Sequence, residues 1–400
     1  MITAWRRSFW VLLGAALILF LSLGTRHGFG LFLSPMSMEF GWGREIFAFA
    51  MALQNLVWGI FQPITGALAD RFGARRTIVV GGLLYTVGLV LMSFASSPLS
   101  LSISAGVLIG IGLSGTSFSV ILGVVGRVVP PEKRSMAMGI AAAAGSLGQF
   151  AMLPGSLGLI EWLGWSAALI VLGITAAFIM PLAVMIKDSP PISHGPQQTL
   201  EEALREACNH SGFWLLAFGF FVCGFQVVFI GVHLPAYLVD QQLPVIVGTT
   251  ALALVGLFNV FGTYIAGWLG SKHSKPRLLS ALYLVRAVVI ALFITFPVTT
   301  WTAYAFSIAM GLLWLSTVPL TNGTVATMFG VRNLSMLGGI VFFFHQIGSF
   351  LGGWLGGYLF DRTGSYELVW YISIALSFVA AALNWPVKEQ SVARIERAQA

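Results

Sequence analysis

Twelve apolar stretches of about 20 residues recur along this chain, and each could cross a hydrocarbon core of roughly 30 Å as a helix. Lipid offers the backbone no hydrogen-bond partners, so a spanning segment must satisfy its own polar groups. Charged residues make up only 9% of the 400 residues, whereas a soluble domain carries about 25%. The chain is therefore predicted to be an all-α membrane protein. Its spans are placed at 9–36, 45–69, 77–96, 99–126, 135–160, 165–186, 212–238, 246–270, 278–297, 301–327, 334–360 and 366–386.

The basic residues predict how the chain is oriented in the membrane. With the N-terminus inside, 17 of the 21 Lys and Arg residues lie in cytoplasmic segments. Two lie outside (Arg44 and Arg362) and two lie in spans (Arg26 and Arg286). Such a bias follows the positive-inside rule, so the net charge of +7 reports topology rather than nucleic-acid binding. We expect a multi-pass protein of a bacterial inner membrane with both termini cytoplasmic.

The chain divides into two halves of six spans each. Residues 1–186 are predicted to form an N-terminal bundle and 212–388 a C-terminal bundle, with a cytosolic tail at 389–400. The linker 187–211 is rich in proline and then reads Thr199-Leu-Glu-Glu202, which predicts a capping box at the start of a short amphipathic helix.

The two halves also resemble each other at an offset of 200 or 201 residues. Matches at 200 are Pro35 with Pro235, Ser135 with Ser335, Gly139 with Gly339 and Gly148 with Gly348; matches at 201 are Gly66 with Gly267, Arg71 with Lys272, Arg76 with Arg277 and Thr116 with Thr317. Internal repeats with a binding site at their interface are typical of secondary transporters.

A charged motif lies between the second and third spans. It reads Gly66-Ala-Leu-Ala-Asp70-Arg71-Phe-Gly73-Ala-Arg75-Arg76, and a degenerate copy begins at Gly267. Gly73 permits a tight turn, while Asp70 can face a helix N-terminus and a nearby arginine such as Arg127. The motif resembles the signature loop of the major facilitator superfamily, and the resemblance covers the whole chain. It implies twelve transmembrane helices in two pseudo-symmetric six-helix bundles.

The same resemblance implies a cytoplasmic gate that forms and breaks during alternating access. Its residues would be Gly66, Asp70, Arg71, Gly73, Arg76 and Arg127. The alternative is that these charges only anchor the loop on the cytoplasmic side of the membrane.

Within that superfamily the chain is similar to the branch of monocarboxylate transporters and oxalate:formate antiporters. The resemblance rests on the glycine-aromatic stretch 28–42 and on Phe344-His345-Gln346-Ile-Gly348, which continues to Gly357. The branch places a basic residue late in span 1, where Arg26 and His27 fall, or a lysine in span 11 near His345. It also relies on an arginine in span 8, which here carries no charge. Either Arg26 holds the carboxylate instead, or the substrate is not a simple monocarboxylate.

Arg26 and His27 lie side by side in the first apolar stretch. A charge there costs roughly 2.5–3.5 kcal/mol on insertion scales, so it is expected to face protein or water and to mark a functional site. None of the 14 acidic residues is placed in the interior of a span. A lumen with basic groups and no carboxylates suits an anion, and a guanidinium can bind a carboxylate at two points. The alternative is an arginine that snorkels outward or braces a carbonyl.

Histidines and uncharged polar residues complete the predicted site. His27 and His345 are the candidates for proton coupling, although His345 could instead be neutral and bonded between helices. The other predicted substrate contacts are Asn55, Gln149, Gln226, Asn259, Trp314, Asn322 and Gln346. The three asparagines and Gln149 could instead merely hydrogen-bond across helices, and Trp314 could face lipid or fill a packing gap. Two residues are left undecided: Arg286 could brace the carbonyls of a neighbouring span, and His233 could lie at the membrane interface.

Several function classes are not supported by any motif in the sequence. It contains no phosphate-binding Gly-x-x-x-x-Gly-Lys-Ser/Thr, and its six histidines and two cysteines show no metal-ligand spacing. We therefore expect no enzyme activity, no cofactor and no metal. The predicted function is secondary active transport of a small organic anion, a monocarboxylate, by a monomer that uses proton symport or anion exchange. Two alternatives stay open: a proton-coupled multidrug exporter of the same fold, and a transporter-like sensor that moves nothing.

Overall fold

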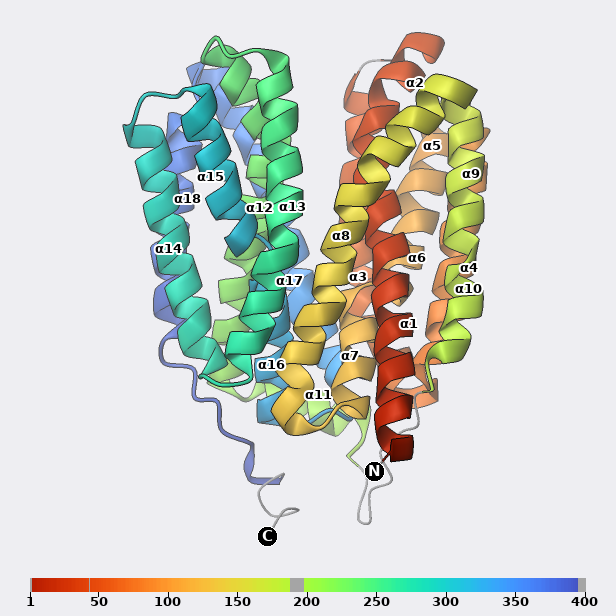
Figure 1. The fold of residues 1–400 in the computed structure, drawn as a ribbon, viewed down its shortest axis with the longest axis vertical. Helices are drawn as coiled ribbons and strands as arrows, with labels where there is room; N and C mark the ends of the chain where they lie inside the picture. The colour runs from red at the N-terminus through yellow and green to blue at the C-terminus, as the bar shows by residue number, and fades with distance from the viewer. Residues whose placement is uncertain (1, 43, 188–197, 395–400) are drawn as a thin grey trace. The chain divides into compact units, whose positions relative to one another are not determined.

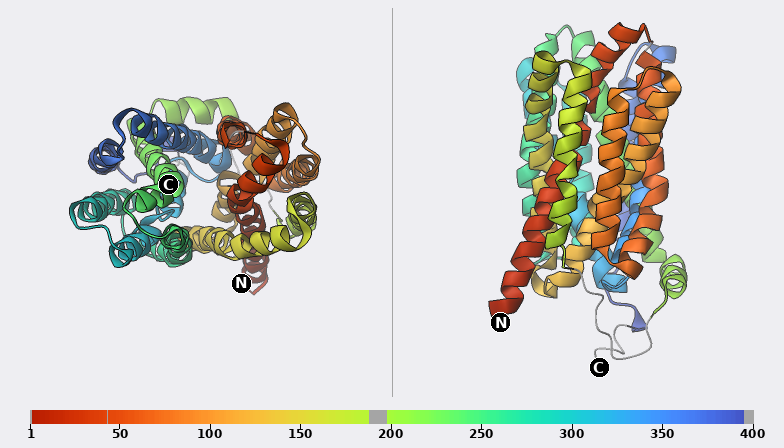
Figure 2. Two further views of the ribbon diagram at one scale, coloured as in Figure 1. Left: turned by 90° about the horizontal axis from the view of Figure 1, so that it is seen from above. Right: turned by 90° about the vertical axis from the view of Figure 1, so that its right-hand side faces the viewer.

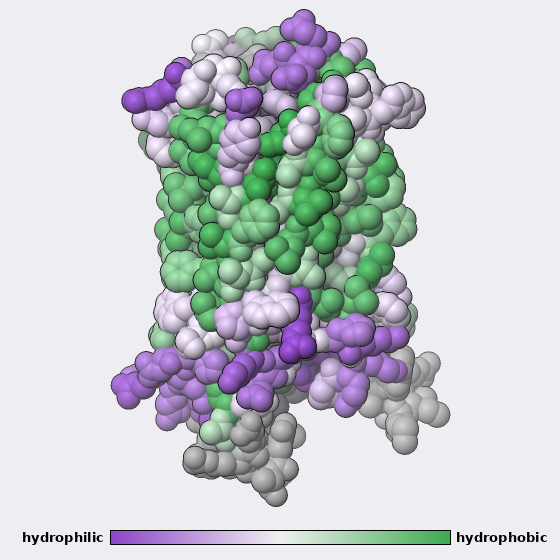
Figure 3. Space-filling model, turned by 90° about the vertical axis from the view of Figure 1, so that its left-hand side faces the viewer, coloured by the Kyte–Doolittle hydropathy of each residue, from purple (hydrophilic) through white to green (hydrophobic). Residues whose placement is uncertain are grey.

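The computed structural model describes residues 2–42, 44–187 and 198–394, and this part of the chain is helical with no strand. Within it, twelve helical segments are long and apolar enough to cross a membrane. Figure 3 shows one face of the molecule, on which hydrophobic residues form a broad band and hydrophilic residues gather at both ends. The predicted all-α membrane protein with twelve spans is confirmed.

The first half runs from α1 to α10. The helices are α1 (Ile2–His27), α2 (Leu33–Phe40), α3 (Arg44–Phe72), α4 (Ala74–Ser93), α5 (Pro98–Leu101), α6 (Ile109–Thr116), α7 (Phe118–Val128), α8 (Pro131–Leu163), α9 (Trp165–Ala177) and α10 (Ile179–Leu182). Short 3-10 segments follow α1 (Gly28–Phe32) and α10 (Ala183–Met185), and a π-helical segment (Ser102–Leu108) follows α5.

The second half runs from α11 to α18. The helices are α11 (Leu200–Cys208), α12 (Ser211–Asp240), α13 (Val245–Gly270), α14 (Lys275–Thr295), α15 (Thr300–Leu313), α16 (Thr317–Phe329), α17 (Leu334–Thr363) and α18 (Glu367–Asn384). Figure 1 labels these elements, and Figure 2 shows that the helices of each half run side by side in roughly one direction.

The chain packs as two compact units. Unit 1 comprises residues 1–130, 144–197 and 332–339, and unit 2 comprises 131–143, 198–331 and 340–400. The units follow the two sequence halves except that the start of α8 packs with unit 2 and the start of α17 with unit 1. The predicted linker boundary stays a prediction, because residues 188–197 lie outside the described residues.

Proline explains two of the breaks within spans. A proline ring clashes with the carbonyl four residues earlier and ends the helix there. Accordingly α9 ends at Ala177, four residues before Pro181, and the gap between α15 and α16 lies just before Pro319. Pro63 and Pro154 instead lie inside the continuous helices α3 and α8.

Glycines at repeat-related positions let helices touch within each unit. In unit 1, a Cβ added to Gly66 of α3 would overlap the backbone carbonyl of Ser335. In unit 2, a Cβ on Gly267 of α13 would lie 2.7 Å from the carbonyl oxygen of Ser135. Small residues permit such backbone contact where no hydrophobic effect drives helices together. The repeat therefore places equivalent segments, the starts of α17 and α8, against equivalent glycines.

The linker helix α11 begins with the predicted capping box. The Thr199 hydroxyl accepts a hydrogen bond from the Glu202 N–H at 3.2 Å, and the Glu202 carboxylate accepts one from the Thr199 N–H at 2.7 Å. These bonds lower the pKa of Glu202 below its ordinary value, because they favour the charged carboxylate. The capping-box prediction is confirmed.

Candidate functional site

The two basic residues of span 1 lie where the helix changes form. Arg26 and His27 are the last residues of α1, and the 3-10 segment Gly28–Phe32 follows at once. Arg26 is half-buried and His27 is exposed. The His27 Nδ1 lies 2.9 Å from the carbonyl oxygen of Leu23, one turn earlier in its own helix. The two neighbours therefore have different surroundings, as expected for consecutive residues about 100° apart on a helix.

Arg26 is held by side chains of α3. Its Nη2 donates a hydrogen bond to Asn55 Oδ1, and its guanidinium carbon lies 5.1 Å from the centre of the Trp58 ring. Its Nε is buried without a hydrogen-bond partner among the described residues. No carboxylate of the described chain forms an ion pair with it. The guanidinium thus has no neutralising carboxylate among the described residues, an unused donor at Nε and partial exposure, the properties that an anion site needs.

Trp58 is in turn fixed by the break in span 4. Its Nε1 donates to Gln62 Oε1 at 2.7 Å and lies 2.9 Å from Ser117 Oγ. Ser117 is the extended residue between α6 and α7, and its hydroxyl also donates to Gln62 Oε1 at 2.9 Å. Gln62 Nε2 donates to the freed carbonyl of Ser114 at 2.8 Å. Non-helical backbone at membrane depth is tolerated where it is buried in protein or lines a cavity. Here the non-helical residue Ser117 bonds to Trp58, which lies beside Arg26.

Sequence reasoning missed Trp58 and Gln62. A signal was available, because Asn55, Trp58 and Gln62 are spaced i, i+3 and i+7 and so share one face of α3. A polar-aromatic-polar face on a spanning helix next to Arg26 would have named all three.

Carboxylates keep to the ends of the helices. Every acidic residue within a helix of the described chain lies among the first three or last three residues of that helix. The interiors of the described spans therefore carry no negative side chain that could neutralise a buried base. This distribution favours an anion over a cation as the partner of Arg26.

Arg286 in unit 2 has a different environment from Arg26. It is fully buried, and its Nη2 donates to the carbonyls of Leu313 and Trp314, which the break between α15 and α16 leaves without helical partners. Its Nη1 donates to Gln226 Oε1 at 3.3 Å, and Gln226 Nε2 donates to Ser377 Oγ at 2.6 Å. The predicted residues Gln226, Trp314 and Arg286 thus form one interior network, with Arg286 bracing carbonyls.

His345 and Gln346 are neighbours in the interior of unit 2. The His345 ring is 7% exposed and lies parallel to Phe342, with ring centres 5.3 Å apart. Its Nδ1 is 3.3 Å from Gln346 Oε1 and 3.4 Å from Ser349 Oγ. Its Nε2 has no hydrogen-bond partner among the described residues. A buried imidazole with one unpaired nitrogen can gain or lose a proton only if a path reaches it.

Two predicted asparagines of unit 2 form hydrogen bonds with backbone groups of span 10. Asn259 of α13 is fully buried, and its Oδ1 accepts from the Leu315 N–H at 3.0 Å, inside the break of span 10. Asn322 of α16 donates from Nδ2 to the Val318 carbonyl at 3.1 Å, while its buried Oδ1 has no partner among the described residues. Asn259 therefore belongs with Arg286 to the set of side chains that satisfy the broken helix.

Two predicted residues are left, Gln149 in unit 1 and His233 in unit 2. Gln149 is buried on α8 in unit 1. His233 links α12 to α17, since its Nε2 lies 2.8 Å from the Gly353 carbonyl oxygen, and its Nδ1 lies 3.3 Å from the Tyr366 hydroxyl.

The predicted gate residues meet at the start of α17. Arg127 donates to Asp70 Oδ1 at 2.6 Å and to Ser335 Oγ at 3.2 Å. Asp70 also accepts hydrogen bonds from the Ser335 and Met336 N–H groups at 3.3 and 2.8 Å. The carboxylate therefore lies between an arginine and a helix N-terminus, where both favour negative charge.

The other motif residues shape or flank this contact. Gly73 has φ = 90° between α3 and α4, a conformation that favours glycine. Arg71 and Arg76 are exposed, and Arg71 lies over the Phe72 ring. Their part in a gate stays a prediction.

Comparison with known proteins decides the family. A model described as Major Facilitator Superfamily matches residues 12–330. The chain belongs to the Major Facilitator Superfamily. This membership agrees with the twelve spans, and it makes the chain an integral multi-pass membrane transporter by family rather than an enzyme.

Relatives of this superfamily member include bacterial and animal proteins. It is 27% identical over 377 residues to the uncharacterized MFS-type transporter YcxA of Bacillus subtilis, covering 88% of each chain. It is 27% identical over 381 residues to monocarboxylate transporter 11 of Homo sapiens, covering 92% of this chain and 80% of that one. The fold is shared with FucP in its outward conformation, with a TM-score of 0.74 at 15% identity over 93% of this chain and 98% of that chain.

Proposed function

We propose that this transporter moves a small organic anion, a monocarboxylate, by secondary active transport with proton symport or anion exchange. The observation that carries the proposal is the environment of Arg26. Its guanidinium contacts an amide and an indole ring, and no described carboxylate pairs with it. The proposal includes a bacterial inner membrane with both termini in the cytoplasm; an even number of spans puts them on one side.

The geometry suggests how a carboxylate would bind. Its two oxygens would accept hydrogen bonds from Arg26, and such charge-assisted bonds contribute about 1.5–3 kcal/mol each. The Trp58 ring, which is 5% exposed, lies beside the guanidinium and would contact the hydrocarbon part of the acid. Asn55 holds the guanidinium in place, so that less conformational freedom is lost on binding.

The names of the relatives support the substrate class. Several proteins at 25–28% identity over most of the chain are monocarboxylate transporters 11, 12 and 13 from vertebrates. Membrane-embedded carboxylates suited to binding cationic drugs are missing from the span interiors of the described chain. Both observations favour an organic acid over a cation.

A histidine would carry the proton in the symport form of the proposal. His345 suits the role better than His27, because it is buried and keeps an unpaired Nε2 among the described residues. In the exchange form, no residue needs to titrate.

Transport in proteoliposomes tests the proposal. Purified protein should accumulate labelled lactate or benzoate down an imposed proton or counter-anion gradient, and Arg26→Gln should abolish this uptake. Arg205→Gln is the matched control, because Arg205 is exposed on α11 and 78% of its side-chain surface is accessible. Arg26→Lys keeps the charge but loses two-point binding, so a partial loss is expected.

Two outcomes would contradict the proposal. Near-normal uptake by a folded, monodisperse Arg26→Gln protein would remove Arg26 from the site. Export of cationic dyes without uptake of acids would instead indicate a multidrug exporter.

A further inference from the structure

One repeat position differs between the two units in a way that leaves a space. In unit 1, Asp70 places a carboxylate at the start of α17, where Ser335 and Arg127 surround it. At the offset of 201 residues, unit 2 has Ser271, whose hydroxyl donates to the Trp268 carbonyl at 2.7 Å in its own helix. The negative charge of the first unit has no counterpart at this position of the second.

A cavity of about 340 Å³ lies at this place in unit 2. Its lining includes two bases, Arg134 and Lys275, and four hydroxyl side chains, Ser135, Ser271, Thr327 and Ser391, and no carboxylate lines it among the described residues. The space therefore combines positive charge with hydrogen-bond donors, which is the chemistry of an oxyanion site.

Ser135 provides a second observation that points to a ligand at this cavity. It is the repeat counterpart of Ser335 at an offset of 200, it lines the cavity, and it is 3% exposed. Its hydroxyl oxygen has no hydrogen-bond partner among the described residues, whereas Ser335 Oγ accepts from Arg127. A buried hydroxyl without a partner is destabilising, and a bound acceptor would supply that partner.

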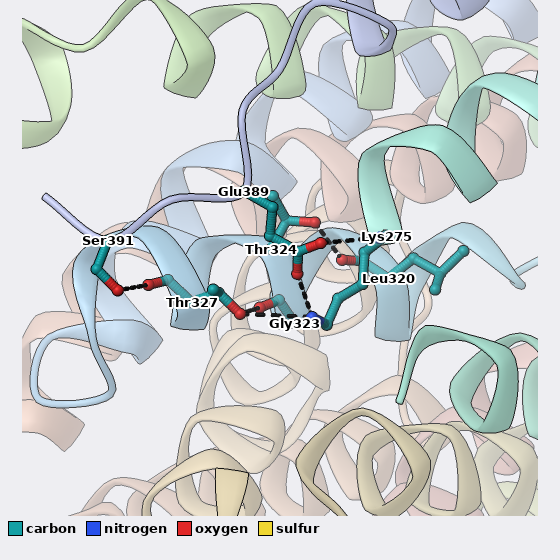
Figure 4. A network of polar contacts seen from close by, with 7 residues as sticks. All are labelled: Lys275, Leu320, Gly323, Thr324, Thr327, Glu389 and Ser391. Atoms are coloured by element: carbon teal, nitrogen blue, oxygen red, sulfur yellow. Dashed lines mark hydrogen bonds and ion pairs between the residues drawn. The ribbon is translucent and has the colours of Figure 1, made fainter. Parts of the chain in front are cut away.

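Lys275 forms one wall of the cavity and is held in place by the C-terminal segment. Figure 4 shows its ammonium beside Glu389 and Thr327, and the Lys275 N–H also donates to Glu389 Oε2 at 2.9 Å. Ser391 donates to the Thr327 carbonyl at 3.1 Å and closes the same side. Glu389 partly neutralises the charge of Lys275, and Glu132 partly neutralises that of Arg134. The serine and threonine hydroxyls that line the cavity must therefore contribute to its selectivity for an anion.

We propose that this cavity binds a small carboxylate or phosphate anion, which takes the place that the Asp70 carboxylate holds in unit 1. The anion would accept hydrogen bonds from Ser135 and Ser271 and face Arg134. It would also lie near the N-terminal end of α8, a helix of 33 residues whose dipole favours negative charge there. The site is separate from Arg26, so it does not depend on the transport proposal.

Thermal unfolding of the full-length purified protein tests this site. Sodium phosphate and sodium benzoate are titrated against sodium chloride at constant ionic strength, and either anion should raise the Tm in a saturable manner. Ser271→Asp supplies the carboxylate in the chain, so it should raise the Tm without ligand and weaken the anion response by about tenfold or more. Ser271→Asn, which adds similar bulk without charge, is the matched control and should keep the response.

Two further variants keep the test decisive. Arg26→Gln should leave the phosphate response unchanged, which separates this site from the transport site. Ser135→Ala, which removes only the buried hydroxyl, should also weaken the anion response. It therefore provides the test if Ser271→Asp does not fold. A response to phosphate alone indicates an inorganic oxyanion, and a benzoate response that persists in Arg26→Gln indicates an organic acid; both support the site. Three results would overturn the proposal. The first is the absence of a saturable response to either anion in the wild-type protein, and the second is loss of the response in Arg26→Gln. The third is a response of wild-type size in both Ser271→Asp and Ser135→Ala.

Discussion

Asp70→Asn is the substitution whose effect the structure predicts most directly. The Asp70 side chain has no exposed surface and that of Arg127 only 3%, and their charged atoms are 2.6 Å apart. Removing one partner of a buried pair costs about 3–5 kcal/mol, because it leaves the other charge without compensation. Asparagine keeps one oxygen for the Ser335 and Met336 N–H groups, so we expect a loss near the lower end, about 3 kcal/mol.

A double-mutant cycle measures this coupling. The free energy of unfolding in mixed detergent–SDS micelles is compared for wild type, Asp70→Asn, Arg127→Gln and the double variant. Because the double variant removes both charges, it should lose less than the sum of the single losses by about 1–3 kcal/mol. Glu201→Gln serves as the control, since its pair with Arg205 spans 3.9 Å between side chains 85% and 78% exposed; we expect a change of no more than about 0.5 kcal/mol there.

Additive single losses, or an Asp70→Asn effect as small as that of Glu201→Gln, would refute this reasoning. Either result would mean that the contact of Asp70 with Arg127 adds little to the stability of unit 1. The motif would then act through its loop geometry alone.

Three other substitutions give separate tests. Arg286→Gln should lower the free energy of unfolding by about 2–4 kcal/mol, because it deprives the break in span 10 of its donor; a fully stable variant would show that the break needs no brace. His345→Gln should keep exchange of labelled acid across proteoliposomes but lose the response to a pH gradient, and a retained response would assign the proton elsewhere. Trp58→Ala should raise the KM for benzoate about tenfold or more while changing that for acetate less; equal changes for both acids would remove the ring from the site.

The spans could be predicted because hydrophobic length alone determines them. Their breaks could not all be found in this way. Span 4 is placed at 99–126, and within it Ser117 is extended between α6 and α7. No proline lies there; the break is satisfied by Trp58 and Gln62 from another helix. A local sequence pattern carries no information about such tertiary partners. The break in span 10, by contrast, is predicted by Pro319 in the sequence itself.

Arg26 could be singled out from the sequence because charge in an apolar stretch is rare and costly. Its immediate contacts depend on which face of α3 packs against α1. The order of the helices along the chain does not determine that face, so the contacts could not be predicted. The contact of Asp70 with Arg127 could be predicted from the motif. The internal repeat and the charges of the neighbouring residues restrict which groups can pair with the Asp70 carboxylate. The structure places Arg127 and the start of α17 around it.

The two arginines within the membrane show why residue type alone does not assign function. Both cost free energy on insertion, and each has an Nε without a partner among the described residues. Arg286 has no exposed surface, and both of its terminal nitrogens donate to groups at a helix break or beside it. Arg26 is half-buried, and its Nη2 donates to the side-chain oxygen of Asn55. A ligand can compete more readily for a donor that bonds a half-buried side-chain amide than for donors that satisfy buried carbonyls. Arg26 is therefore the arginine that we propose for anion binding, whereas Arg286 braces the break in span 10.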